Sequence, residues 1–191
     1  MTDLIFELEP FENEAHKGVR GVVGAYGDTM VYNIKPARPQ GSNEILHAHL
    51  ASEYLPEARL GGIGVSGQPS PYKASLEVGG APARLTYNSY GLTRSSRALR
   101  IKYLERAYTY TCLKSLTRNA ELRRPGMHVT VTTGKYVPKL GDRRHGTAEG
   151  DFDEVDLAVA LVFEAVTIDP LDPVAAAVYA SQRSNANSKE P

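Results

Sequence analysis

Short runs of alternating apolar and polar residues constrain the fold of this 191-residue chain more than any other feature. In the first run, Leu4, Phe6 and Leu8 alternate with Ile5, Glu7 and Glu9. The same period of two recurs in residues 127–133 and 155–168. Successive side chains of a β-strand point to opposite faces of the sheet, so a period of two indicates a strand with one buried face. We therefore expect strands in all three runs.

A hairpin is expected near the N-terminus. Residues 19–26 and 30–35 are rich in strand-forming side chains, and Gly27-Asp28 lies between them. Glycine adopts positive φ without steric cost, which a tight hairpin turn requires. A further short strand is expected at residues 73–78, between two segments rich in glycine and proline.

Two helices are expected from their start signals. Ser42 can cap a helix over residues 43–54, which Pro56 would end. Near the C-terminus, Asp172 followed by Pro173 is the combination typical of an N-cap and a first helical residue. Both signals predict where a helix begins, and neither depends on hydrophobic periodicity.

The middle of the chain is ambiguous. Residues 92–124 contain neither glycine nor proline. Within them, residues 95–119 are compatible with a helix capped by Ser95 or Ser96, which we favour, or with a long strand. Residues 138–153 are polar and contain glycine, so they are expected to form a long exposed loop.

These elements predict an α+β fold with an antiparallel or mixed sheet of about seven strands and two or three helices. Residues 1–183 are expected to form one domain, because the length is close to the common size of a single domain. Residues 184–191 have little to bury and are expected to form a disordered tail.

Composition indicates a cytoplasmic protein. The single cysteine, Cys112, excludes an intramolecular disulfide and fits a reducing compartment. The acidic N-terminus lacks the features of a signal peptide. The longest apolar run, residues 155–168, is interrupted by Asp156 and Glu164 and is too short to span a bilayer, so no transmembrane segment is expected.

Charge is segregated along the chain although the net charge is zero, with 22 Lys and Arg against 22 Asp and Glu. Residues 94–124 contain nine basic residues and two acidic ones. Residues 149–173 contain eight acidic residues and no Lys or Arg. The basic residues are Arg94, Arg97, Arg100, Lys102, Arg106, Lys114, Arg118, Arg123 and Arg124.

The basic segment predicts a nucleic-acid-binding surface. Arg and Lys displace counterions from phosphates, and interleaved tyrosines can stack on bases. The residues expected to bind are Arg94, Arg97, Arg100, Lys102, Tyr103, Arg106, Arg123 and Arg124. Tyr108 and Tyr110 lie in the same segment. Two alternatives are that the basic and acidic stretches neutralise each other within the fold, and that the basic face is an ordinary solvated surface.

The leading hypothesis is a non-enzymatic binding or assembly protein. It would engage nucleic acid or an acidic partner through the basic segment and self-associate through the acidic region as a homo-oligomer. A structural component of a virion, a phage or another nucleoprotein complex fits this class. A protein-only adaptor is a third possibility.

An enzymatic alternative comes from the histidines. His128 is followed two residues later by Thr130 in a predicted strand, the arrangement that two-histidine phosphoesterases carry twice. The second histidine would be His49 or His47, and the substrate RNA or a cyclic phosphate. His47 and His49 would share a face only on a strand, so their predicted place on a helix argues against a metal site.

Two further candidate sites lie in expected loops. Arg143, Arg144 and His145 lie in the expected loop at 138–153 and could hold an anion. Residues 62–67 match G-x-G-x-x-G formally, but the prolines that follow prevent the helix that a dinucleotide site needs. No cofactor is therefore expected.

Overall fold

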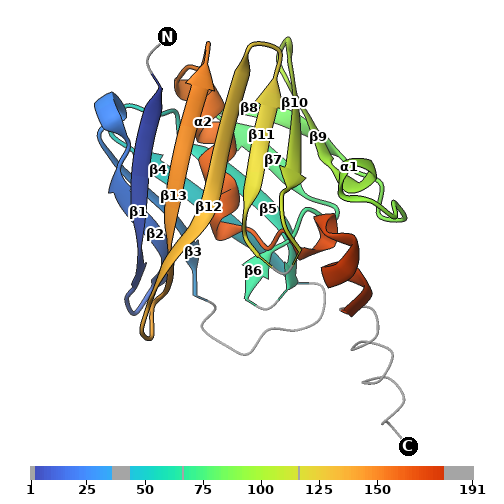
Figure 1. Cartoon of the computed structure of the whole chain (residues 1–191). Coiled ribbons are helices and arrows are strands. Elements are labelled where there is room, and N and C mark those ends of the chain that lie inside the picture. Colours follow the sequence, from blue (N-terminus) through green and yellow to red (C-terminus); the bar gives the residue numbers. More distant parts are fainter. Residues whose placement is uncertain (1–2, 36–43, 66, 116, 179–191) are drawn as a thin grey trace, which may run out of the picture.

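A closed ring of antiparallel strands forms most of the molecule, as the computed structural model in Figure 1 shows. The structure describes residues 3–35, 44–65, 67–115 and 117–178. Within these ranges, twelve strands form a closed barrel. The ring order is β4–β3–β2–β1–β13–β12–β11–β10–β9–β8–β7–β5, and β5 pairs back onto β4. The predicted α+β fold with a sheet of about seven strands is therefore wrong.

The strands follow each other closely along the chain. They are β1 (Leu4–Glu12), β2 (His16–Val22), β3 (Asp28–Ile34), β4 (Ile45–Ser52), β5 (Ala58–Val65), β6 (Gln68–Pro69), β7 (Ser75–Val78), β8 (Ala81–Thr86), β9 (Leu99–Tyr103), β10 (Arg106–Cys112), β11 (Ala120–Arg124), β12 (Met127–Val137) and β13 (Gly141–Gly150). The two-residue β6 pairs with the end of β5 outside the ring.

Helical segments are short. They are α1 (Arg94–Arg97), α2 (Glu154–Leu161), the 3₁₀ segments η1 (Gly24–Tyr26), η2 (Val162–Ala165) and η3 (Asp169–Leu171), and a helical stretch at 173–178. No helix in the described part of the chain is long and apolar enough to cross a membrane.

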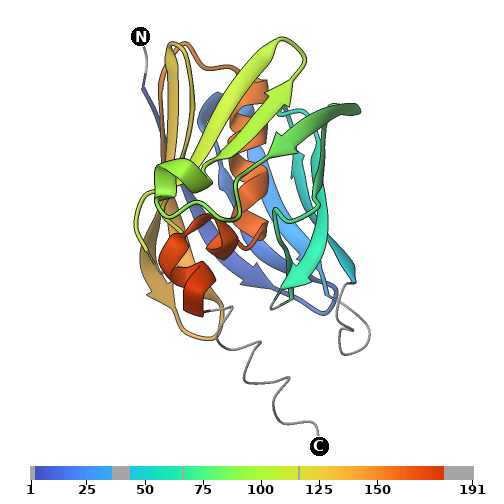
Figure 2. The ribbon, with the colours of Figure 1, turned by 90° about the vertical axis from the view of Figure 1, so that its right-hand side faces the viewer.

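Helix α2 and segment η2 fill the inside of the barrel (Figure 2, orange). Every residue from 156 to 168 is buried. An eight-stranded barrel is just wide enough for its own side chains to fill, and the diameter grows with strand number. A twelve-stranded ring therefore needs additional filling, and α2 with η2 supplies it. The Tyr110 ring of β10 stacks on Phe163 of η2 with 4.3 Å between centroids.

The strand wall explains the alternating pattern. In β9, Leu99, Ile101 and Tyr103 are buried and face the helix, whereas Arg100 and Lys102 are exposed. Full burial of each large apolar side chain contributes about 1.5–3 kcal/mol to folding. Along each strand of the wall, successive side chains therefore point alternately into the barrel and out to solvent.

The structure confirms several predicted elements. Strands lie at 4–12, at 75–78 and at 127–137, and β2 and β3 form the expected antiparallel pair. The turn between them differs from the expected one at Gly27-Asp28, because residues 24–26 form η1 and Asp28 already belongs to β3. Asp172 caps the helical stretch at 173–178, because its Oδ1 accepts a hydrogen bond from the Val174 N–H at 2.8 Å. The predicted tail, 184–191, lies outside the described residues, as does the end of the predicted domain.

Four element predictions are wrong. The expected helix at 43–54 is strand β4 in its described part, and the favoured helix at 95–119 is mainly strands β9 and β10, with only α1 helical. The expected loop at 138–153 contains strand β13. The expected strand at 155–168 is α2 and η2, because a helix buried on every face has no polar stripe and loses the helical period from its sequence.

Candidate nucleic-acid interface

Strand alternation divides the basic segment between the two faces of the barrel wall. Arg106 of β10 and Arg124 of β11 occupy inward-facing positions, in step with the buried Tyr108 and Leu122. Arg100 and Lys102 of β9 face outward. The basic residues of 94–124 are therefore split between the inside and the outside of the barrel and do not form one continuous surface.

The inward pair binds the start of the inner helix. Asp156 is fully buried on α2, and its carboxylate accepts hydrogen bonds from Arg124 Nε at 2.9 Å and from Tyr108 Oη at 2.9 Å. Arg106 reaches both Asp153 at 2.6 Å and Asp156 at 3.2 Å. Hydrogen bonding to Asp153 raises the pKa of Arg106, and the same contact lowers the pKa of Asp153. Arg106 and Arg124 therefore pair with carboxylates of the inner helix and its N-cap.

A second buried charge cluster joins strand β13 to segment η2. Arg144 of β13 donates from Nε to the Glu164 carboxylate of η2 at 2.9 Å, and both side chains are buried. Arg118 donates to the backbone oxygens of Glu164 and Val166 at 3.0 and 2.6 Å. Burial raises the pKa of Glu164, and the neighbouring guanidinium groups of Arg144 and Arg118 counteract part of this effect.

The remaining predicted contact residues near α1 also have internal partners. Arg94 donates to the Leu113 carbonyl at 3.2 Å and to Ser115 Oγ at 2.7 Å. Arg97 donates to two backbone carbonyls, those of residues 91 and 170, at 2.6 and 2.7 Å. The tyrosines expected to stack on bases, Tyr103, Tyr108 and Tyr110, are all buried. These side chains therefore fix loops or fill the core.

The outward cations gather on the neighbouring strands β8 and β9. Arg84 of β8 lies directly opposite Lys102, and Thr86 lies opposite Arg100. Two shallow depressions of about 300 and 280 Å³ meet at Thr86. The first is lined by Arg84, Thr86, Arg100, Ile101, Lys102, Ala107, Tyr108 and Thr109. The second is lined by Pro71, Tyr72, Lys73, Ala74, Leu85, Thr86, Tyr87 and Ser89.

We call Tyr72, Lys73, Arg84, Arg100 and Lys102 the basic outer surface. None of the described residues that line its two depressions is Asp or Glu. Within the described chain, the four cations form no ion pair within 4.0 Å. The exposed Tyr72 ring lies 5.5 Å from the Lys73 ammonium, measured to the ring centroid. This surface can attract an anionic group without first displacing a carboxylate.

Arg123, the remaining predicted contact residue, lies beside this surface but is paired. It lies opposite Thr109 of β10, and its Nη2 is 2.9 Å from Glu121.

The predicted anion-binding loop is instead part of a strand with paired charges. Arg143 and His145 of β13 face outward beside β1. Arg143 lies 2.9 Å from Glu9 and 3.6 Å from Glu7, and the His145 ring lies 3.9 Å from Glu7. Arg144 points inward to Glu164, as described above. The structure does not bring these three side chains together around one anion.

The predicted histidine pair is also separated. His128 of β12 shares a hydrogen bond of 2.9 Å with Thr130 and lies 3.2 Å from Glu121. His49 and His47 lie on β4, and four strands of the ring separate β4 from β12. Because β4 is a strand, His47 and His49 do share the outer face, with 6.2 Å between ring centroids. In the described part of the chain, no group of three or more His, Cys, Asp or Glu side chains is arranged to hold a metal ion.

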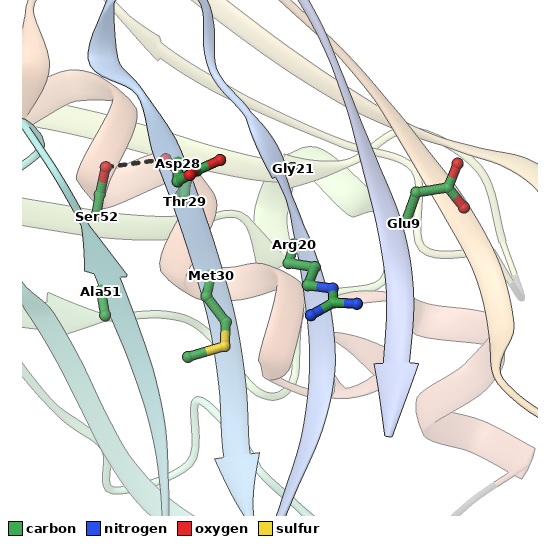
Figure 3. Close-up of a pocket in the computed structure, with 8 residues that line it drawn as sticks. All are labelled: Glu9, Arg20, Gly21, Asp28, Thr29, Met30, Ala51 and Ser52. Carbon is green, nitrogen blue, oxygen red and sulfur yellow. Dashed lines mark hydrogen bonds between the residues drawn. The ribbon is translucent and has the colours of Figure 1, made fainter. Parts of the chain in front are cut away.

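Another hollow, of about 740 Å³, lies on the outer face of β1 to β4 (Figure 3). It is lined by Glu9, Arg20, Gly21, Asp28, Thr29, Met30, Ala51 and Ser52. Figure 3 shows the Glu9 carboxylate directed away from Arg20, which fits its ion pair with Arg143. Its open, mixed-charge lining is less suited to a polyanion than the basic outer surface.

Three residues of the basic outer surface were missed in the sequence, namely Tyr72, Lys73 and Arg84. They lie outside the segment with the strongest charge excess. Arg84 could have been found from the alternation of residues 81–86, in which Arg84 and Thr86 share one face. Lys73 and Tyr72 lie in a loop, where periodicity gives no signal.

The fold and surface together define a helix-filled antiparallel β-barrel with a basic outer surface. Comparisons with protein families, with curated proteins and with solved structures gave no match.

Proposed function

We propose that this protein is a non-enzymatic nucleic-acid-binding protein whose contact surface is the basic outer surface. The observation that carries the proposal is the group of three cations Arg84, Arg100 and Lys102 on two adjacent strands. Among the described residues, none of the three has an ion-pair partner and no carboxylate lines the depression between them. Lys and Arg that neutralise phosphates release condensed counterions, which drives binding. Since the net charge of the chain is zero, the attraction has to come from such a local group.

A single-stranded ligand fits this surface better than a duplex. Tyr72 is 47% exposed beside Lys73, and its ring is accessible for stacking on an unpaired base. Stacking of a base on an aromatic side chain contributes about 1–3 kcal/mol. The depressions are shallow, so the backbone of a flexible strand can follow them from Lys102 to Tyr72.

Fluorescence anisotropy with a labelled oligothymidylate tests the proposal. The variant Arg100→Gln/Lys102→Gln removes two cations of the surface. We expect at least about tenfold weaker binding at low salt, because a phosphate that is no longer neutralised keeps its condensed counterions. The slope of log affinity against log salt should also become shallower, by about 0.7 for each phosphate that the variant leaves without a cation.

The matched control is Lys114→Gln/Lys135→Gln. It makes the same change in net charge at two exposed lysines outside the surface, and we expect it to bind nearly as the unchanged protein does. Equal affinities of the two variants would refute the proposal. Absence of salt-sensitive binding to any oligonucleotide would instead favour an acidic protein as the partner.

Tyr72→Ala tests the preference for a single strand. It should weaken binding to the oligothymidylate by about 1–3 kcal/mol and leave binding to a duplex of the same sequence nearly unchanged. Equal losses for both ligands would show that Tyr72 does not stack on bases.

Self-association through the acidic region stays a prediction. In the described chain, Asp153, Asp156, Glu164 and Asp172 all have intramolecular partners, which leaves the exposed acids at Glu149, Asp151, Glu154 and Asp169. Light scattering in low and high salt measures the oligomeric state directly.

A further inference from the structure

A cluster of rings and charges lies on the outer face of β3 to β7. His47 and His49 of β4 face outward between the buried Leu46, Ala48 and Leu50. His49 lies opposite Tyr32 of β3 and, on its other side, opposite Arg59 of β5. Arg59 in turn lies opposite Glu77 of β7. Four neighbouring strands therefore bring these side chains together.

The rings are held in place. Tyr32 stacks on His49 with 5.4 Å between centroids and 18° between planes, and His16 meets the Tyr32 ring edge-on at 4.7 Å. The His47 ring lies over Gly61, where an added Cβ would come within 3.0 Å of the imidazole. Positions fixed before binding reduce the entropy lost when a ligand binds.

Hydrogen bonding fixes the orientation of Arg59 and leaves one His49 nitrogen without a partner in the described chain. Arg59 donates from Nε to His47 Nδ1 at 3.3 Å, which orients the guanidinium and places the His47 proton on Nε2. His49 Nε2 is buried and has no hydrogen-bond partner in the described chain. Burial lowers the pKa of both histidines, with a further contribution from the Arg59 charge, so both rings are neutral near pH 7.

Arg59 and His49 border a polar hollow of about 390 Å³, and His47 lies next to it through its contact with Arg59. Its lining contains the cation Arg59 and the two carboxylates Glu57 and Glu77. No ion pair within 4.0 Å joins Arg59 to any acidic residue that the structure describes. Charges of both signs therefore line one concave site without neutralising each other. The other lining residues are Tyr32, His49, Leu50, Ala51, Ala58 and Gly80.

We propose that this hollow binds a small zwitterion that carries a carboxylate and an ammonium group, as an amino acid or a short peptide does. The carboxylate binds Arg59, next to the His49 ring, and the ammonium binds Glu57 or Glu77. Side chains directly opposite on neighbouring strands have Cβ atoms about 4.5–5.5 Å apart, a spacing that a dipeptide can bridge. The site is separate from the basic outer surface and does not depend on the nucleic-acid proposal.

The charges of the hollow favour a zwitterion over a simple anion or a simple cation. With neutral histidines, the hollow holds one positive and two negative charges, so a phosphate dianion is repelled by Glu57 and Glu77. A simple cation can bind Glu57 or Glu77 but leaves the Arg59 charge without a counter-charge. A zwitterion satisfies both signs, and like-charge juxtaposition is how a site rejects wrong partners.

Imidazole NMR of the full chain tests this proposal, with glycylglycine as the probe and acetate and methylammonium as single-charge comparisons. We expect saturable shifts of the His47 and His49 ring signals with glycylglycine, and at least about tenfold weaker binding of either single-charge probe. His128 and His145, which lie on β12 and β13, serve as internal controls and should not shift.

Arg59→Gln should weaken glycylglycine binding at least about tenfold, because it removes the charge but keeps a long polar side chain. The matched control, Arg123→Gln, removes an exposed arginine of β11 outside both surfaces and should leave glycylglycine binding unchanged. Thermal unfolding establishes that both variants are folded. The proposal is overturned if no ring signal of His47 or His49 shifts, if acetate binds as tightly as glycylglycine, or if Arg59→Gln binds as the unchanged protein does.

Discussion

Arg124 holds the carboxylate of Asp156 with two hydrogen bonds, from Nε to Oδ1 at 2.9 Å and from Nη2 to Oδ2 at 2.7 Å. This two-point contact joins the barrel wall at β11 to the first turn of the inner helix. Planar guanidinium and carboxylate groups match in this geometry, which makes it stronger than a single hydrogen bond. Arg106 and Tyr108 contact the same carboxylate, so one buried aspartate ties two strands to the helix.

Replacement of Asp156 by Ala should destabilise the protein by about 3–5 kcal/mol, because it leaves the largely buried Arg124 guanidinium without a counter-charge and the buried Tyr108 hydroxyl without its partner. Urea denaturation measures the loss. Glu154→Ala, two residues earlier on the same helix and exposed, is the control and should change the free energy of unfolding by less than about 0.5 kcal/mol. Similar losses for both variants would contradict the role assigned to Asp156.

Asp153 should make stability depend on acid pH. Hydrogen bonding from Arg106 lowers the pKa of Asp153 below its ordinary value of 3.8. The folded state therefore binds fewer protons than the unfolded state in this range, and the stabilisation is present above about pH 4 and lost as pH falls through the lowered pKa. Asp153→Asn keeps a side chain that caps helices well but carries no charge.

We expect the stability difference between the unchanged protein and Asp153→Asn to be largest near neutral pH and to shrink as the pH falls below about 4. Urea denaturation at a series of pH values measures it. Asp151→Asn, an exposed neighbour, should show no such trend. A difference that stays constant with pH would show that the charge of Asp153 contributes nothing.

Cys112 should be unreactive in the folded protein. Burial raises the pKa of its thiol to about 12, and the thiolate is the reactive form. Reaction with a disulfide reagent at about pH 8 should be on the order of 1,000-fold slower in the native protein than in urea. Because the chain has a single cysteine, the absorbance change reports on this residue alone. Rapid labelling under native conditions would mean that the barrel wall near β10 opens often.

Gly146 should tolerate no side chain. It lies opposite Phe6 in the pairing of β1 with β13, and an added Cβ would overlap the Phe6 ring. Gly146→Ala should cost about 1–3 kcal/mol of stability, as overpacking in a core does. Thermal unfolding in a double-mutant cycle isolates the cause. The loss of stability caused by Gly146→Ala should be smaller when Phe6 is replaced by Leu. An equal loss in both backgrounds would show that contact with Phe6 is not the cause.

Local sequence rules predicted the parts of the fold that depend only on neighbouring residues. The alternation of Leu4, Phe6 and Leu8 predicted a strand with a buried face, and residues 127–133 did the same for β12. Asp172 before a proline marked the start of a helical stretch. These signals succeed because strand alternation and helix capping act within a few residues of the chain.

Which charged residues stay exposed could not be predicted from the sequence, for a physical reason. Lys, Arg, Asp and Glu are rarely buried unless they are paired, so charged residues are expected at the surface. Four of them lie in the interior instead: Arg118, Arg144, Asp156 and Glu164. Whether they are paired depends on contacts such as Arg144 to Glu164, which join a strand of the wall to the helix inside it. The basic outer surface contains only the cations that face outward, and strand pairing in the barrel decides which ones do.

By itself, the sequence determined where several strands run, which of their side chains share a face, and where the last helical stretch starts. Tertiary structure alone decided that the sheet closes through β4 and β5, that residues 154–165 enter the barrel as a helix, and which cations remain outside. The reason is that ring closure and the filling of its interior depend on pairings between residues far apart in the chain. The apolar run at 155–168 has no period that distinguishes a buried helix from a buried strand until the surrounding barrel exists.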